Sequence, residues 1–306
     1  MKKKRFTGVM PPMITPFTAD GAVDHAAFIA NIERWNEDAL GGYLVNGSNS
    51  ETAYLSEEEK LQLLRHTLKH AKAGRTIIAG TGLESLPETI RFTNVCAAEG
   101  AGYALVLTPC YYHSEMTSAA LTDFFTRLAE ASRIPILIYN VPKFSHVNIK
   151  ADAVKKLAEH PNIVGMKDSA GDVPQLASFL SVSAGQDFEI FAGTVAVWFP
   201  ALALGIEAGI HATANCAPNA CAAVQQAYAA GDHELARAIY QVLLPLNTAV
   251  TATYGIAGLK YAAEILGYHG KAVRCPLQPL TEKQQQELRL IVETARQGMR
   301  GLGQNL

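Results

Sequence analysis

Short apolar runs rich in β-branched and aromatic residues recur along the chain, and a segment with helical periodicity follows each of them. Ser56 to Ala73 is such a segment, and its Ser56 and Glu59 form the pattern of a capping box. Thr117 to Ser132 is another, with large apolar residues on one face. This alternation is typical of parallel strands joined by helices. It predicts eight strands, at Val9 to Ile14, Tyr43 to Asn46, Thr76 to Ala79, Ala104 to Leu107, Ile134 to Tyr139, Ile163 to Lys167, Glu189 to Ala192 and Gly209 to Ala214.

The predicted strand and helix units occupy residues 1–230, with no linker rich in proline, glycine or serine between them. A closed (β/α)8 TIM barrel takes about 250 residues and fits this arrangement better than two open-sheet domains. Residues 231–306 show only helical patterns. We expect them to form a C-terminal helical appendage that packs on the barrel or on a neighbouring subunit, with helices at Glu234 to Val250, Gly258 to Leu266 and Glu282 to Gln297.

Composition narrows the class of protein. Of the 306 residues, 49% are hydrophobic and 18% are charged, which provides ample apolar material for a globular core. The 26 basic and 28 acidic residues lack the basic excess of a nucleic-acid binder, so we expect a small-molecule ligand. The longest apolar run, Val195 to Ile206, contains Pro200 and is too short for a membrane span, which takes about 20 residues.

The N-terminus and the cysteines bear on cellular location. Met1 to Arg5 (MKKKR) is similar to the charged start of a signal peptide, but Pro11, Pro12 and Pro16 interrupt the stretch that follows. We therefore interpret it as a solvated terminus. The five cysteines are widely spread and lack the paired spacing of a zinc site. We expect a cytoplasmic protein with no bound metal and no cofactor.

Polar residues at strand ends are the candidates for chemistry, because the active sites of such barrels lie at the carboxyl ends of the strands. Lys167 ends the predicted sixth strand. The residues alone leave two interpretations open. The amine either points into the barrel mouth, where desolvation makes it available to form an imine with a ketone, or it pairs with a carboxylate such as that of Asp168.

Three further candidates follow strand ends. Tyr139, on the strand before the lysine strand, is either a proton-transfer group or a packed rim residue. The turn Gly47 to Glu51 (GSNSE) offers backbone N–H groups and the Ser48 and Asn49 side chains to a carboxylate, although such turns are also common as plain loops. The tyrosines of Thr108 to Tyr112 (TPCYY) either join a proton relay or cover the rim or a subunit contact.

Five motifs together resemble the dihydrodipicolinate synthase and N-acetylneuraminate lyase family in their order and spacing. They are PPMITPFTADG, GSNSE, TPCYY, IYNVP and GMKDS, and they extend over nearly the whole chain. The resemblance implies a pyruvate-dependent class I aldolase on a (β/α)8 barrel, usually assembled as a homotetramer.

The resemblance also implies roles for single residues. Lys167 forms the imine with pyruvate or another 2-oxo acid, and Tyr139 transfers protons. Ser48 takes the place of the relay hydroxyl, Asn49 helps to hold the pyruvate carboxylate, and Tyr112 resembles a tyrosine offered across a subunit interface. The other expected substrate contacts are Gly47, Phe144, Gly193 and Thr194.

Departures from the family pattern concern the substrate. Dihydrodipicolinate synthases usually have an arginine two residues after the NVP proline, where this chain has Phe144, so we do not expect that activity. The Ser-Asn pair of GSNSE, the cysteine of TPCYY and the segments HPNIVGMKDS and YGIAGLK resemble the 4-hydroxy-2-oxoglutarate aldolase branch. Ser50 and His146 replace usual glycines, and the loop must differ if either position needs a positive φ.

We therefore expect cleavage of a 4-hydroxy-2-oxo acid, with 4-hydroxy-2-oxoglutarate the best candidate, to pyruvate and an aldehyde. Family alternatives are dihydrodipicolinate synthase, N-acetylneuraminate lyase and a 2-keto-3-deoxy sugar-acid aldolase. A catalytically silent paralogue that binds an oxo acid is the alternative outside these enzymes, although it has no chemical need for the lysine, the tyrosine and the hydroxyl together. A metal-dependent aldolase lacks convincing ligand spacing, because His113, His146 and His211 are scattered and interpreted as packing or rim residues.

Overall fold

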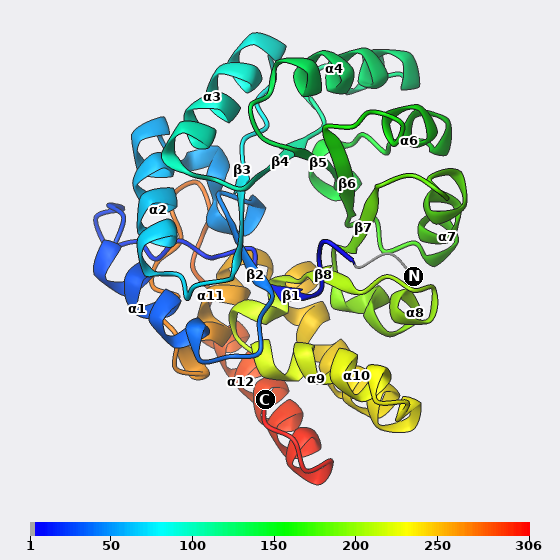
Figure 1. Cartoon of the computed structure of the whole chain (residues 1–306). Helices are drawn as coiled ribbons and strands as arrows, with labels where there is room; N and C mark the ends of the chain where they lie inside the picture. The colour runs from blue at the N-terminus through cyan, green and yellow to red at the C-terminus, as the bar shows by residue number, and fades with distance from the viewer. Residues whose placement is uncertain (1–3) are drawn as a thin grey trace.

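The computed structural model describes residues 4–306 and contains a barrel of eight parallel strands (Figure 1). Neighbouring strands pair in the order β1-β8-β7-β6-β5-β4-β3-β2, and bridges from Val9 to Leu40 and from Pro12 to Leu44 close the ring between β1 and β2. The (β/α)8 prediction is confirmed. The strands are β1 (Gly8–Met10), β2 (Gly42–Val45), β3 (Thr76–Gly80), β4 (Tyr103–Leu107), β5 (Ile136–Asn140), β6 (Ile163–Asp168), β7 (Glu189–Ala192) and β8 (Ala208–Ile210).

Helices surround the barrel, and their ends follow local sequence signals. The capping box predicted at the start of α2 is present, because the Ser56 hydroxyl accepts from the Glu59 N–H while the Glu59 carboxylate accepts from the Ser56 N–H. The helices of the ring are α1 (His25–Asn36), α2 (Glu57–His70), α3 (Leu86–Glu99), α4 (Ser118–Ala131), α5 (Pro142–Ser145), α6 (Ala151–Leu157), α7 (Val173–Val182), α8 (Trp198–Ala203) and α9 (Pro218–Ala229). Short 3-10 turns lie at η1 (Ser48–Ser50), η2 (Thr52–Tyr54), η3 (His113–Glu115), η4 (Val195–Val197) and η5 (Ala212–Asn215).

Strands β1 and β8 end well before the predicted last residues, Ile14 and Ala214. Strand β1 ends at Met10, because the two prolines that follow lack the N–H that a sheet ladder needs, and β8 ends at Ile210 before η5. The Asn215 side chain holds the two continuing segments together. It accepts from the Ile14 N–H at 3.0 Å and donates to the Pro12 carbonyl at 3.0 Å. A side-chain amide therefore replaces the predicted strand pairing at this edge.

The interior of the barrel is filled at its amino-terminal end. Phe6 lies 4.8 Å from the rings of both Tyr103 and Phe191, measured between ring centroids. Apolar side chains from the strands form the rest of this inner core: Met10, Leu44, Ile78, Leu105, Leu137, Tyr139, Val141, Val164, Ala208 and Ile210. A larger core lies between the strands and the helices. The only part of the barrel axis left for a ligand is thus the carboxyl end.

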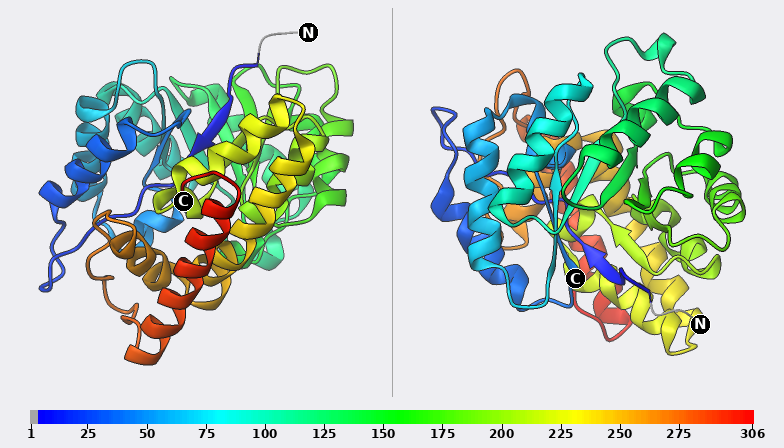
Figure 2. Two further views of the ribbon diagram at one scale, coloured as in Figure 1. Left: turned by 90° about the horizontal axis from the view of Figure 1, so that it is seen from below. Right: turned by 45° about the horizontal axis from the view of Figure 1, so that its top comes forward.

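The C-terminal residues form α10 (His233–Thr248), a π-helical turn η6 (Ala249–Thr253), α11 (Gly255–Ile265) and α12 (Glu282–Gly301). Helix α10 packs against α9 of the barrel, and Figure 2 shows α12 beside α10. The predicted helix from Glu234 to Val250 is wrong at its end, because the chain widens there into the π turn. Such turns often occur at functional sites.

The chain start is charged and exposed where it is described. The Arg5 guanidinium forms an ion pair with Asp187 at 2.6 Å, and the Lys4 ammonium donates to the Gly205 carbonyl at 3.1 Å. The rest of the solvated terminus that the sequence predicts, residues 1–3, lies outside the described residues. Within residues 4–306, every helix is too short or too polar to cross a bilayer.

His211 is a fully buried polar residue directly after β8. Its ring packs edge to face on Trp198 with 4.8 Å between ring centroids, and neither ring nitrogen has a hydrogen-bond partner among the described residues. Burial, aided by the positive charge of Lys167, lowers the pKa of His211 to about 3. The folded protein therefore keeps this imidazole neutral at all ordinary pH values.

We expect His211 to make the fold sensitive to acid. Below about pH 6.5 the unfolded chain binds a proton at this histidine that the folded protein does not bind, so the free energy of unfolding decreases as the pH falls. Between pH 7 and pH 5 this loss is about 2 kcal/mol. Urea unfolding at the two pH values should show that His211→Gln removes most of it, whereas His233→Gln, at an exposed histidine, does not. An equal pH dependence in wild type and His211→Gln would contradict the assignment.

Candidate active site

A pocket of about 470 Å³ lies at the carboxyl ends of the strands. This volume is typical of small-molecule sites. Its walls come from the strand ends and βα loops on one side and from the C-terminal helices on the other. The polar residues that line it are Asn49, Tyr139, Lys143, Lys167, Ser169, Thr194, Asn247, Thr248 and Thr251.

Lys167 lies on β6 with its side chain buried in this pocket, where it is 3% exposed. Strand β5 pairs with β6 so that Tyr139 is the direct neighbour of Lys167, and the Lys167 Nζ lies 4.3 Å from the centroid of the Tyr139 ring. The described residues include no ion pair between Lys167 and Asp168. The alternative interpretation of Lys167 as the partner of that carboxylate is therefore wrong.

Asp168 has a different set of partners. Its Oδ1 accepts from Asn140 Nδ2 at 2.6 Å and from Gln175 Nε2 at 3.1 Å. Burial raises the pKa of this carboxyl group, and the two amide donors oppose the shift. Because Asn140 ends β5 and Asp168 ends β6, this contact aligns the two strand ends that present Tyr139 and Lys167.

The GSNSE segment folds around the 3-10 turn η1, and a second turn, η2, follows it. Ser48 Oγ lies 3.5 Å from the Tyr139 hydroxyl, and either oxygen can act as the donor. Gly47 and Ser48 line a smaller recess of about 40 Å³ that shares Tyr139 with the main pocket, whereas Asn49 lines the main pocket. The N–H groups of Ser50 and Glu51 bond to carbonyl groups inside the turn, so these two do not take part in an anion nest.

Gly193 and Thr194 follow β7 and also line the pocket. A Cβ on Gly193 would lie 2.1 Å from Ser169 Oγ and 2.4 Å from the Asp168 carbonyl oxygen, so only glycine fits there. The Thr194 hydroxyl accepts from the Ala196 N–H at 3.2 Å and donates to Asn247 Oδ1 at 3.4 Å. Both residues therefore lie where a ligand in the pocket can contact them.

Asn247 is a pocket residue that the sequence analysis missed. It lies on α10, is 3% exposed, and its Oδ1 accepts from the hydroxyl groups of Thr194 and, at 3.2 Å, Thr213. These two donors fix the orientation of the amide, which leaves Nδ2 as a donor without a partner among the described residues. No motif marks Asn247, because its neighbours in space come from β7 and β8.

Phe144 and Lys143 lie on the rim, on the short helix α5. Phe144 is 52% exposed. Lys143 Nζ donates to the Thr251 carbonyl at 2.5 Å and lies 5.5 Å from the centroid of the Phe144 ring. Dihydrodipicolinate synthases usually have arginine at the position of Phe144. This chain therefore presents an aromatic ring there, and the neighbouring Lys143 supplies the positive charge.

The two positions where this chain replaces a glycine differ. His146 has φ 54° and ψ 12°, a left-handed conformation, so this loop keeps a backbone that favours glycine and carries some strain. Ser50 is not among the residues with positive φ, and its buried hydroxyl donates to the Met13 carbonyl at 2.6 Å. The side chain of Ser50 thus gains a bond that a glycine lacks.

Tyr112 lies outside both pockets of its own chain. It is 70% exposed and packs edge to face on Tyr111 with 5.0 Å between ring centroids. Its role across a subunit interface stays a prediction.

The exposed rings of His113 and His146 lie 6.0 Å apart, measured between ring centroids. Within residues 4–306, no three His, Cys, Asp or Glu side chains converge as metal ligands.

Comparisons with known proteins agree with this geometry. The model of the dihydrodipicolinate synthetase family matches residues 5–295. The 4-hydroxy-tetrahydrodipicolinate synthase of Methanoculleus marisnigri is 32% identical over 289 residues, covering 94% of this chain and 98% of that protein.

Solved structures give the same result. The 4-hydroxy-tetrahydrodipicolinate synthase of Methylacidiphilum fumariolicum aligns with a TM-score of 0.91 and 28% identity, over 98% of this chain and 99% of that one. A chloride-inhibited dihydrodipicolinate synthase from Acinetobacter baumannii, complexed with pyruvate, aligns with a TM-score of 0.89 and 30% identity, over 95% and 99%. The chain therefore belongs to the dihydrodipicolinate synthetase family of Schiff-base-forming class I aldolases.

Proposed function

We propose that this protein cleaves a 4-hydroxy-2-oxo acid to pyruvate and an aldehyde, reversibly, through an imine at Lys167. The substrate that we assign is 4-hydroxy-2-oxoglutarate, whose cleavage gives glyoxylate. The pyruvate complex of the Acinetobacter relative supports pyruvate as the ligand of the lysine. The buried amine beside the Tyr139 phenol supports the imine chemistry.

The charge pattern of the pocket carries the substrate assignment. Among the described residues that line it, Lys143 and Lys167 are the cations, and none is Asp, Glu or Arg. A substrate with two carboxylates and no cationic group matches such a lining. Aspartate semialdehyde instead carries an ammonium group, which finds no carboxylate in this pocket and is repelled by Lys143.

The reaction uses groups that the pocket already holds. The Lys167 amine loses a proton and attacks the C2 ketone, and loss of water gives a protonated imine. The C4 hydroxyl then loses its proton, the C3–C4 bond breaks to release the aldehyde, and the electron pair moves to the imine nitrogen to form an enamine. Protonation at C3 and addition of water release pyruvate and restore the lysine.

Proton transfer and binding are assigned to the neighbouring side chains. Tyr139 accepts and returns protons at the reacting centre, and Ser48, at 3.5 Å from its hydroxyl, continues the relay. Asn49, Gly193 and Thr194 contact the pyruvate portion. Lys143 binds the distal carboxylate as a single point charge on the rim.

A second function is favoured by the names of the relatives. These include 4-hydroxy-tetrahydrodipicolinate synthases at about one third identity over nearly the whole chain. That activity joins pyruvate with aspartate semialdehyde on the same imine. It shares Lys167 and Tyr139 with our proposal and differs in the rim, where Phe144 stands.

We also propose a homotetramer in the cytoplasm, with Tyr112 reaching a neighbouring subunit.

Trapping tests the imine. Borohydride added with pyruvate should reduce the imine to a stable amine at Lys167, and peptide mapping by mass spectrometry should find it there. Lys260, a second buried lysine that is held in an ion pair, should stay unmodified. Active protein without an adduct at Lys167 rules out the mechanism.

Activity should also survive EDTA. Loss of activity with EDTA and its recovery with a divalent ion would point to a metal-dependent aldolase.

Tyr139→Phe tests the proton transfer. Removing the hydroxyl should lower kcat by about 10²- to 10⁴-fold, the usual contribution of general acid–base catalysis, while trapping at Lys167 continues more slowly. Tyr103→Phe is the matched control, because Tyr103 is also a barrel tyrosine but lies at the opposite end beside Phe6. Near-normal turnover of Tyr139→Phe would reduce that residue to a packing role.

Substrate comparison decides between the two functions. Under matched conditions, kcat/KM for cleavage of 4-hydroxy-2-oxoglutarate should exceed that for condensation of pyruvate with aspartate semialdehyde. A higher value for the semialdehyde would assign the protein to the synthases. If neither substrate reacts while Lys167 traps pyruvate, a sugar-acid aldolase becomes the leading assignment.

Lys143→Met tests the proposed carboxylate contact. A hydrogen bond to a charged group contributes about 1.5–3 kcal/mol, so kcat/KM for 4-hydroxy-2-oxoglutarate should fall by about 10- to 100-fold. Trapping of pyruvate, which lacks the distal carboxylate, should not change. Lys155→Met, at an exposed lysine on α6, is the control, and an equal effect of the two variants would remove Lys143 from the site.

A further inference from the structure

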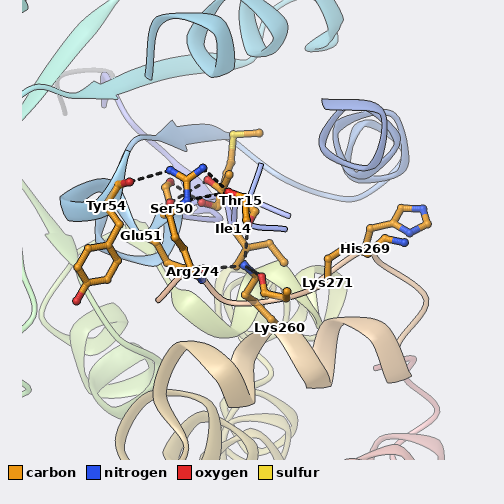
Figure 3. Close-up of polar contacts among 12 residues, drawn as sticks. Ile14, Thr15, Ser50, Glu51, Tyr54, Lys260, His269, Lys271 and Arg274 are labelled. Carbon is orange, nitrogen blue, oxygen red and sulfur yellow. Dashed lines mark hydrogen bonds and ion pairs between the residues drawn. The ribbon is translucent and has the colours of Figure 1, made fainter. Parts of the chain in front are cut away.

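A buried ion pair lies behind the pocket wall, outside the groups that the mechanism uses (Figure 3). Lys260 Nζ and Glu51 Oε1 are 2.7 Å apart, and the two side chains are 1% and 0% exposed. The ammonium also donates to the carbonyl groups of Thr15, at 2.7 Å, and Ala272. The other carboxylate oxygen of Glu51 accepts from the backbone N–H of Arg274 at 2.8 Å. Each charged group is therefore enclosed by partners.

The pair joins two walls of the pocket. Glu51 is the residue after η1, which carries Ser48 and Asn49, and it has the left-handed backbone angles φ 57° and ψ 37°. Lys260 lies on α11, one helical turn after Ile256, which lines the opposite side of the pocket. The width of the pocket between the GSNSE turn and α11 is thus set by a contact between residues 209 positions apart.

Further contacts hold the rest of the turn. The Thr15 hydroxyl donates to the Ser50 carbonyl at 2.9 Å. The Arg274 guanidinium donates to the Tyr54 carbonyl at 2.7 Å and forms an ion pair with Glu59 at 2.7 Å, so it spans the segment after the turn (Figure 3). The backbone on both sides of Glu51 is therefore tied to segments far away in the sequence.

Stability alone does not explain why two charged side chains occupy this buried position. Burial lowers the pKa of Lys260 to about 8, even though the Glu51 carboxylate opposes the shift, which reflects the cost of taking the ammonium out of water. Well-packed apolar side chains often replace buried ion pairs without loss of stability. The pair instead fixes the position of the turn. Each of the two charged groups binds its partners only in certain directions, so a single arrangement of the turn satisfies both.

We infer that Glu51 and Lys260 are positioning residues that hold Ser48 and Asn49 at their distances from Tyr139 and Lys167. This inference rests on the proposed function of the turn in binding and proton transfer. The pair touches no substrate and acts through Ser48 and Asn49 alone. Its loss should therefore matter only as long as the turn has groups to position.

A double-mutant cycle tests this. The clamp variant combines Glu51→Gln with Lys260→Met, which removes both charges at similar volume. It is made in the wild type and in a background that carries both Ser48→Ala and Asn49→Ala. In the wild type, kcat/KM should fall by about 10- to 100-fold, the usual cost of a displaced catalytic group. In the Ser48→Ala, Asn49→Ala background the same change should cost less than about threefold, because coupled residues are not additive.

The control is the exposed pair of Glu57 and Arg91, which joins α2 to α3 at 2.5 Å. Glu57→Gln combined with Arg91→Met should leave kcat/KM unchanged. Circular dichroism and thermal unfolding establish that each variant is folded. If the clamp variant does not fold, Glu51→Asp takes its place, since it keeps the charge and shortens the reach by one methylene.

The outcomes are separable. Equal losses in the two backgrounds show a purely structural pair and overturn the inference, as does unchanged kcat/KM in the clamp variant. Wild-type kcat/KM in the protein that carries Ser48→Ala and Asn49→Ala overturns it too, since the turn then has no functional group to position. Failure of the wild type itself to form the pyruvate adduct at Lys167 rejects the proposed function instead.

Discussion

The parallel register of β5 and β6 is the constraint on which the site depends. It makes Tyr139 and Lys167 direct neighbours, and because side chains alternate along a strand, it turns Asp168 to the opposite face, where Asn140 and Gln175 bind it. A shift of one residue would put the carboxylate in the pocket and the amine outside it. The lysine therefore shares the pocket with a phenol, and the nearest carboxylate in sequence cannot neutralise it.

The pocket is lined by residues of both the barrel and the C-terminal helices. Three of the contacts that connect the two parts are Lys143 with the Thr251 carbonyl, Thr194 with Asn247, and the buried ion pair of Glu51 and Lys260. Each contact reaches a different βα loop. A boundary at residue 230 separates the chain by type of secondary structure, but residues from both sides of it line the pocket.

Local patterns were sufficient for most of the fold and for the centre of the site. The period of the apolar residues located the strands, and the place of Lys167 at a strand end located the pocket. Asn247 and Lys260 could not be found this way, because their partners lie 53 and 209 residues away and no local motif records a contact of that kind. The end of β1 does carry a local signal, the two prolines after Met10, but the Asn215 amide that bonds the segment beyond it lies 201 and 203 residues away from its partners Ile14 and Pro12.

The substrate is decided by different residues from those that define the family. A lysine, a tyrosine and a hydroxyl at fixed strand ends serve any reaction that passes through a pyruvate imine, so agreement with the synthases over nearly the whole chain says little about the second reactant. In our proposal that reactant meets the rim, where the lining provides Lys143 and Phe144 and lacks an acidic side chain among the described residues. An ammonium group brought to such a rim loses its water without gaining a partner, whereas a second carboxylate gains one. The charge of the rim therefore carries more information on the aldehyde than the fold does.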